Sequence, residues 1–101
     1  MIICNVTYKV ENEIFFDWMR WQKEEHIPEI MATGFFEEFR IFHLLEYYDE
    51  AGSTYIIQYL TTSTERFLQF RNQFENSFQR DAFSRWGERC TSFQTLMESV
   101  Q

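Results

Sequence analysis

His26 is the residue of this sequence best suited to proton transfer at neutral pH. An imidazole ordinarily titrates near neutrality, and two carboxylates, Glu25 and Glu29, accompany it in the segment Glu-Glu-His-Ile-Pro-Glu. The same ring at the end of a helix would instead bond the last carbonyls and complement the helix dipole. The sequence therefore leaves two interpretations of His26, a catalytic acid or base and a helix cap.

Polar residues on two predicted strands form a second group that could contact a ligand. If the apolar residues of the first strand face the helices, Asn5 points to the other face, and Gln58 and Arg40 join it in the matching register. With Trp21 of the first helix, these groups could orient a small molecule in a cleft between sheet and helices or between subunits. They could equally form a hydrogen-bond network that fixes how two subunits dock.

Other chemistries find little support in the sequence. Glu25, His26 and Glu29 resemble a metal-ligand cluster, but Pro28 interrupts them and there is no second histidine pair to complete a site. His43 lies between Phe and Leu residues in a predicted strand, which favours a core or interface histidine. No histidine follows it, so the second helix offers no imidazole ligand. We therefore expect no metal and no cofactor.

The two cysteines, Cys4 and Cys90, lie far apart and have no Cys-x-x-Cys partner. The first residues lack the basic and apolar regions of a signal peptide, and no apolar run is long enough to span a bilayer. These features predict a reducing, cytoplasmic location in which both cysteines are free, buried thiols. Neither cysteine has a neighbouring base, so nucleophilic catalysis is not expected.

The first half of the chain predicts a strand followed by a long helix. Residues 2–10 alternate between two faces as a strand does, and the pattern then changes to helical spacing with Trp18 and Trp21 on one side. Asn12 is the predicted N-cap. Pro28 predicts a kink at His26 and Ile27, followed by one last turn before Gly34.

The second half predicts two strands, a helix and a final strand. Residues 35–48 and 54–61 are rich in aromatic and branched side chains and flank turn residues 49–53, which indicates a hairpin. Ser63 or Thr64 is expected to cap a helix that ends at Gly87, with an apolar stripe of phenylalanines at positions 67, 70, 74 and 78. The last strand is expected over residues 88–99.

This order of elements is that of a ferredoxin-like βαββαβ fold in one α+β domain over residues 1–101. Right-handed crossovers put the antiparallel strands in the spatial order 4-1-3-2, with both helices on one face. The other face would be bare, although strands two and three carry apolar residues on both faces. Twelve Phe, five Tyr and three Trp residues in 101 add to the apolar surface that must be covered. We therefore expect a homodimer in which two open faces meet.

Charge excludes one class of partner. Sixteen acidic and nine basic residues give a net charge of −7. Only four basic residues precede position 66, so clusters of the kind that bind phosphates are absent. We expect no nucleic-acid partner and no membrane partner.

Three blocks of the sequence carry a resemblance to a known family. They are the segment from Trp18 to Phe35 with its Glu-His-Ile-Pro and Ala-Thr-Gly motifs, the strand Thr54 to Tyr59, and the ending Phe93 to Glu98. In order and spacing they resemble the short bacterial proteins of domain-of-unknown-function family 4286. This resemblance implies membership of the dimeric α+β barrel superfamily, whose activities include cofactor-free oxygenation, lactone isomerisation, haem breakdown and chlorite chemistry.

Two functional hypotheses follow. In the first, the protein binds or transforms a small molecule in a cleft between sheet and helices, with His26 as acid or base and Asn5, Arg40, Gln58 and Trp21 as orienting groups. In the second, it is a non-catalytic dimeric interaction module with an acidic face. An open cavity lined by His26 would favour the first, and a cavity filled by Trp and Phe side chains the second.

Overall fold

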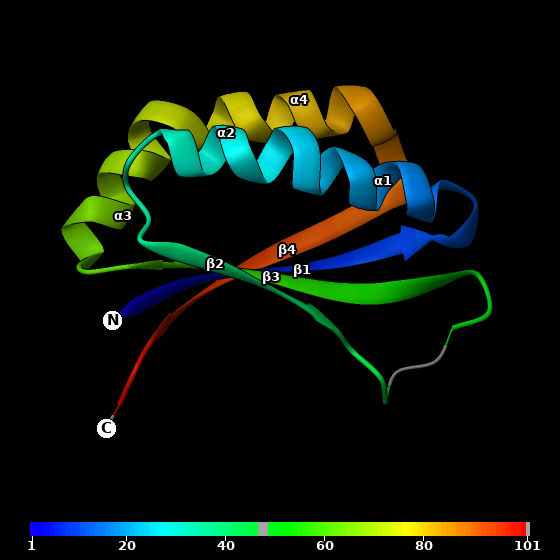
Figure 1. The fold of residues 1–101 in the computed structure, drawn as a ribbon, viewed down its shortest axis with the longest axis horizontal. Helices are drawn as coiled ribbons and strands as arrows, with labels where there is room; N and C mark the ends of the chain where they lie inside the picture. Colours follow the sequence, from blue (N-terminus) through cyan, green and yellow to red (C-terminus); the bar gives the residue numbers. More distant parts are fainter. Residues whose placement is uncertain (47–48, 101) are drawn as a thin grey trace.

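A computed structural model describes residues 1–46 and 49–100. One four-stranded antiparallel sheet carries two long, interrupted helices on a single face (Figure 1). In chain order the elements are β1 (Ile2–Glu11), a 3-10 turn η1 (Asn12–Ile14), α1 (Phe15–Trp21), a π-helical turn η2 (Gln22–His26), α2 (Ile27–Ala32), β2 (Glu38–His43), β3 (Gly52–Thr61), α3 (Thr64–Phe70), a π-helical turn η3 (Arg71–Glu75), α4 (Asn76–Trp86), a 3-10 turn η4 (Gly87–Arg89) and β4 (Cys90–Glu98).

The sheet has the strand order β2-β3-β1-β4, which is the predicted order 4-1-3-2 read in reverse. β1 is central and pairs with β3 on one side and β4 on the other. The ferredoxin-like α+β fold expected from the sequence is confirmed.

Alternation along β1 assigns its side chains to the two faces of the sheet. Cys4, Tyr8 and Val10 are buried beneath the helices, where Tyr8 packs edge-on against Trp18 with ring centroids 5.2 Å apart. Asn5 lies on the opposite face, as the alternation predicts. Most of the apolar core therefore lies between the sheet and the helices, and it includes Phe67 and Phe70 of α3.

The first helix does not break at Pro28. Residues 15–32 keep helical backbone angles, and the N–H of Ile27 donates to the carbonyl of Gln22, one residue further back than in an α-helix. This π-helical turn widens the helix directly before Pro28, which has no N–H to donate and would crowd a regular α-helical turn. The irregularity predicted at Pro28 is therefore a widened turn within one continuous helix. The predicted cap is wrong, since Asn12 lies inside η1 and its side chain donates to the carbonyl of Glu50.

The second helix begins where the sequence places it. The Ser63 side chain accepts a hydrogen bond from the N–H of Arg66 at 3.2 Å, so Ser63 and not Thr64 is the N-cap of α3. The helix ends at Gly87, whose φ of 57° lies in the left-handed region that glycine tolerates.

The second strand is much shorter than predicted. Residues 35 and 36 precede β2, and Phe36 packs into the core against Phe70 with centroids 4.8 Å apart. The carbonyl of Phe35 accepts a hydrogen bond from the hydroxyl of Thr61, which ties this connection to β3. The predicted strand began too early because aromatic residues are common in strands and also in loops that pack into a core. The end of the predicted strand, at Tyr47 and Tyr48, lies outside the described residues.

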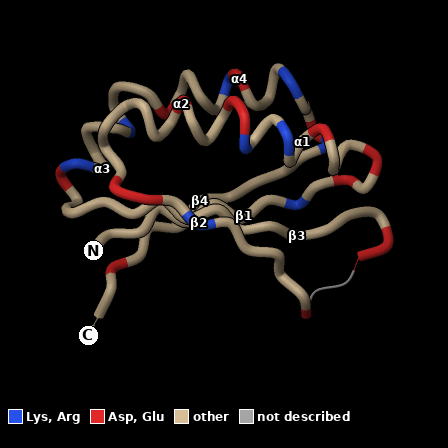
Figure 2. The backbone as a smooth tube through the Cα atoms, in the orientation of Figure 1, with Lys and Arg blue, Asp and Glu red and all other residues tan. Residues whose placement is uncertain are grey.

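The free face of the sheet carries apolar side chains, among them Phe42 of β2 and Met97 of β4, which are 44% and 38% exposed. Charged residues concentrate on the helices and loops, and most of the sheet carries none (Figure 2). No helix in the described part of the chain is long and apolar enough to cross a membrane.

Candidate functional site

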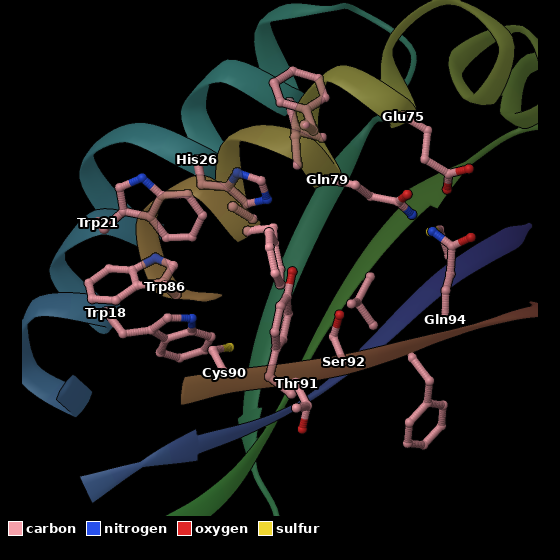
Figure 3. A pocket seen from close by; sticks show the side chains of 18 of the residues that line it. Trp18, Trp21, His26, Glu75, Gln79, Trp86, Cys90, Thr91, Ser92 and Gln94 are labelled. Carbon is pink, nitrogen blue, oxygen red and sulfur yellow. The ribbon is translucent and has the colours of Figure 1, made fainter. Parts of the chain in front are cut away.

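A cavity of about 550 Å³ lies between the two helices and the β1–β4 half of the sheet (Figure 3). Aromatic side chains from both helices and from the sheet dominate its lining. Its polar lining groups include His26 on the first helix, Glu75 and Gln79 on the second, and Ser92 and Gln94 on β4. A concave, mostly apolar space with a few polar groups is the usual form of a small-molecule site.

The face of β4 that meets the helices explains why the cavity is open here. By register with β1, the residues Cys90, Ser92 and Gln94 point toward the helices. A strand packed on a filled core would carry large apolar residues at these positions. Small and polar side chains leave the space unfilled beneath α4.

All three tryptophans of the chain line the cavity. Trp21 packs edge-on against Trp86 with ring centroids 5.7 Å apart, and this contact joins the first helix to the second. Trp18 is fully buried beside Cys90 at the same end of the cavity. The tryptophans therefore form one wall and do not fill the space.

His26 ends the π-helical turn η2 and reaches the cavity from there. Its ring stacks on Trp21 with centroids 4.4 Å apart and meets Phe78 edge-on at 5.8 Å. Burial lowers the pKa of His26 to about 4, and the carboxylate of Asp81 opposes the shift only in part. The imidazole is therefore neutral at pH 7. Within residues 1–46 and 49–100, no group hydrogen-bonds to its nitrogens.

Glu75 ends the other π-helical turn, η3, and lies near Gln94, at the end of the cavity away from Trp18 and Cys90 (Figure 3). Its Oε2 atom pairs with Nε of Arg71 at 3.3 Å, whereas Oε1 is buried and has no partner among the described residues. Arg71 itself lies outside the lining, over the ring of Phe67, and donates to Gln94 Oε1 at 3.3 Å. Both π-helical turns thus end at a titratable residue that lines the cavity.

Further polar groups are buried in the wall without partners. The indole N–H of Trp86 and the hydroxyl of Tyr59 make no hydrogen bond within the described part of the chain. Burial holds the pKa of Tyr59 well above its usual value, so the hydroxyl keeps its proton. A buried polar group without a partner costs free energy. These atoms are therefore positions at which a bound molecule would complete a hydrogen bond.

The two cysteines line the cavity as free thiols. Burial is the main cause that raises the pKa of Cys4 to about 12 and that of Cys90 to about 11. Both remain protonated at neutral pH and are poor nucleophiles. Cys90 pairs in register with Val10, six residues along β1 from Cys4, so about 20 Å separates the two cysteines. That is beyond disulfide reach.

The structure divides the predicted site residues between the two faces of the sheet. Trp21 and His26 line the cavity together, but Asn5, Arg40 and Gln58 lie on the free face. Within one subunit the five residues therefore do not converge on one ligand. Alternation along β1 puts Asn5 on the face opposite Cys4, away from the helices.

On the free face the polar residues form a row across the sheet. Gln58 Nε2 donates to Asn5 Oδ1 at 3.1 Å, and Asn5 Nδ2 donates to Thr95 Oγ1 at 3.4 Å. Arg40 pairs in register with Gln58 but bonds to the carboxylate of Glu38 at 2.7 Å. The hydrogen-bonded row therefore runs through β3, β1 and β4, and Arg40 lies beside it on β2.

The other histidine and the carboxylates beside His26 lie elsewhere. His43 is exposed at the end of β2 and stacks on Tyr55 with centroids 4.6 Å apart. Glu25 and Glu29 are exposed while His26 is buried in the cavity, so the three do not converge.

Sequence reasoning missed most of the polar lining. The π-helical turn that ends at Glu75 changes which side of the helix the following residues face. No residue type is characteristic of such a turn. A signal for Gln94 existed, because positions 90, 92 and 94, which share one face of the predicted last strand, all carry small or polar residues. Such a pattern on a face that should pack against helices indicates an unfilled space.

Solved structures show the same fold over nearly the whole chain. An ethyl tert-butyl ether d (EthD) family protein from Bacillus halodurans matches with a TM-score of 0.68 and 13% identity over 99% of this chain and 100% of that one. A dimeric ferredoxin-like protein from an uncultured marine organism gives 0.68 and 13% over 99% and 95%. SnoaB, a cofactor-independent oxygenase from Streptomyces nogalater, gives 0.57 and 15% over 99% and 94%.

At these identities the likeness concerns the fold alone. A search of curated proteins finds none that matches this sequence. The family model described as domain of unknown function (DUF4286) matches residues 1–100. Because this match covers nearly the whole chain, the chain belongs to the DUF4286 family.

Proposed function

We propose that this protein binds a small, largely apolar molecule in the cavity between its helices and the β1–β4 half of the sheet. The observation that carries the proposal is the open space of about 550 Å³ itself, lined by Trp21, His26 and Trp86. Filling of this space by the tryptophans would have favoured an interaction module with an acidic face.

The cavity supports a limited kind of catalysis. A neutral His26 with unpaired nitrogens can accept a proton from an acidic group of a bound molecule, or donate a hydrogen bond to it. Its low pKa makes it a weak base, so proton abstraction would require a substrate that is itself acidic. SnoaB, a cofactor-independent oxygenase, shares the fold. That likeness concerns the fold and identifies no reaction for this cavity.

We also propose that the protein is a homodimer through the free face of the sheet. Exposed Phe42 and Met97 need cover, and a structural neighbour is described as a dimeric ferredoxin-like protein. In this arrangement the row formed by Asn5, Gln58 and Thr95 would orient the two subunits and would not touch the cavity ligand. Free thiols at Cys4 and Cys90 fit the cytoplasmic location proposed for it.

The binding proposal is tested by filling the cavity. Ala82 of α4 lines it and is half-buried, so Ala82→Phe should occupy part of the space. We expect the wild-type protein to bind the neutral dye Nile red at one site per chain with enhanced fluorescence, and Ala82→Phe to weaken binding at least about tenfold.

Ala32→Phe is the matched control, because Ala32 is exposed at the end of α2 and does not line the cavity. It should bind the dye as the wild type does. Dye binding that is equal in both variants, or lacking in the wild type, would show that the cavity is not a binding site.

A further inference from the structure

The charged side chains that line the cavity are of one sign. Glu75 and Glu88 line it, and within the described residues no lysine or arginine does. His26 adds no positive charge at neutral pH because its imidazole is unprotonated. Sites for carboxylates or phosphates ordinarily use arginine, lysine or a helix N-terminus. The lining therefore disfavours an anionic ligand.

The carboxylate of Glu75 is only partly satisfied. Arg71 approaches Oε2 from outside the cavity, and its guanidinium is further engaged with Gln94 Oε1 and the ring of Phe67. Oε1 is buried without a partner among the described residues. A donor that reached this atom from the cavity would remove the cost of leaving it unpaired.

The aromatic walls favour the same kind of donor. The faces of Trp, Tyr and Phe rings attract organic cations, and the attraction grows where water is excluded. Phe70 and Phe78, whose rings stack with centroids 6.1 Å apart, line the cavity on the helix that carries Glu75. Glu88 lies on the exposed turn η4, where its charge would attract a cation to the cavity.

We propose that the ligand of this cavity is an aromatic amine that carries a positive charge, with its ammonium group at Glu75 and its ring against the tryptophan wall. This inference rests on the proposed function, since it names the ligand class of the same site. Arg71 pairs with the Glu75 carboxylate from outside the cavity, so the ammonium group would share this carboxylate with Arg71. The faces of the aromatic rings that line the cavity would supply the rest of its binding.

Three probes of one shape test the charge preference: biphenylmethylamine, biphenylmethanol and biphenylcarboxylate, which are cationic, neutral and anionic at pH 7. Because all three tryptophans line the cavity, intrinsic fluorescence excited at the red edge of the tryptophan band reports occupancy without background from elsewhere. We expect the amine to bind at least about tenfold more tightly than the alcohol. The carboxylate should bind more weakly than either.

Glu75→Gln keeps the shape of the side chain and removes its charge. It should bring the amine and the alcohol to within about threefold of each other, chiefly by weakening the amine. Glu37→Gln, at an exposed position outside the lining, is the control and should keep the wild-type preference. Arg71→Gln removes the competing cation and should tighten amine binding, an effect opposite to that of Glu75→Gln. This variant keeps the charge inference testable if Glu75→Gln fails to fold.

The outcomes separate the two proposals. If the amine and the alcohol bind equally to the wild type, or if the carboxylate binds best, the charge inference is overturned while the binding function stands. If the amine preference survives in folded Glu75→Gln, the assignment of the ammonium to Glu75 is overturned. If none of the probes and no Nile red binds, the proposed function fails and the inference fails with it.

Discussion

His26 shows how a polar residue becomes part of a largely apolar wall. The imidazole is 6% exposed, stacks on Trp21 and meets Phe78 edge-on. Both contacts are made by the neutral ring without desolvating a charge. Of the two interpretations that the sequence allowed, the helix cap is wrong, because the helix continues to Ala32. The sequence could predict that His26 titrates but not that it is buried, since burial depends on a helix packed against it from residues 64–86.

The burial of His26 should make stability depend on pH. Its pKa is about 4 in the folded protein and about 6.5 when unfolded. Between these values the unfolded chain binds a proton that the folded chain does not. The contribution of neutral His26 is therefore complete above about pH 6.5 and falls as pH falls toward 4, by about 3 kcal/mol in all.

Urea unfolding of the wild type and His26→Phe between pH 4 and pH 7 measures this contribution. Phe keeps the stack on Trp21 and cannot titrate, so the wild type should lose stability relative to the variant as pH falls. His43→Phe, at an exposed position on β2, should behave as the wild type does. A constant difference between the wild type and His26→Phe across this range would mean that His26 is not buried in solution.

At the scale of elements, patterns set by local chemistry were predictable and those set by packing were not. The alternation of β1 and the glycine at the end of the second helix act within a few residues, and both are confirmed. The π-helical turns that bring His26 and Glu75 to the cavity are not encoded by a residue type. Pro28 signalled an irregularity in the first helix, but the sequence could not decide between a kink and a widened turn.

The cap of α3 offers a test at this scale, because the sequence left Ser63 and Thr64 as alternatives. Only the Ser63 hydroxyl accepts the hydrogen bond from the N–H of Arg66. Ser63→Ala should therefore lower the free energy of unfolding by about 1 kcal/mol, as loss of an N-cap does. Thr64→Ala is the control, and chemical denaturation of both variants should show it within about 0.5 kcal/mol of the wild type. A larger loss in Thr64→Ala than in Ser63→Ala would mean that the helix begins one residue later.

The two faces of the sheet differ in what covers them. Helices cover one face of the sheet and enclose the cavity, while the other face presents apolar side chains around the polar row of Asn5, Gln58 and Thr95. The sequence predicted this division because apolar residues on both faces of β2 and β3 cannot all be covered by helices on one side. It could not predict that His26 would be buried beneath the helices, since that depends on how the two helices pack against each other.

The free face predicts a dimer, and a pair of phenylalanines can test it. Two free faces related by a two-fold axis would bury roughly 2,000 Å² or more, the size of an obligate interface. We expect sedimentation equilibrium at micromolar concentration to show a dimer for the wild type. Phe42→Lys on the free face should shift it toward monomer and lower its stability, because a charge would be buried against the partner.

Phe16→Lys provides the matched control for the dimer. Phe16 is 83% exposed on α1, on the helix side, so the same change there leaves the free face intact and should keep the dimer. Because unfolding of a dimer is coupled to its dissociation, the stability of the wild type should also depend on protein concentration, whereas a monomer has no such dependence. A wild type that sediments as a folded monomer would show that the apolar free face is tolerated in water, and the argument for a second copy would then be wrong.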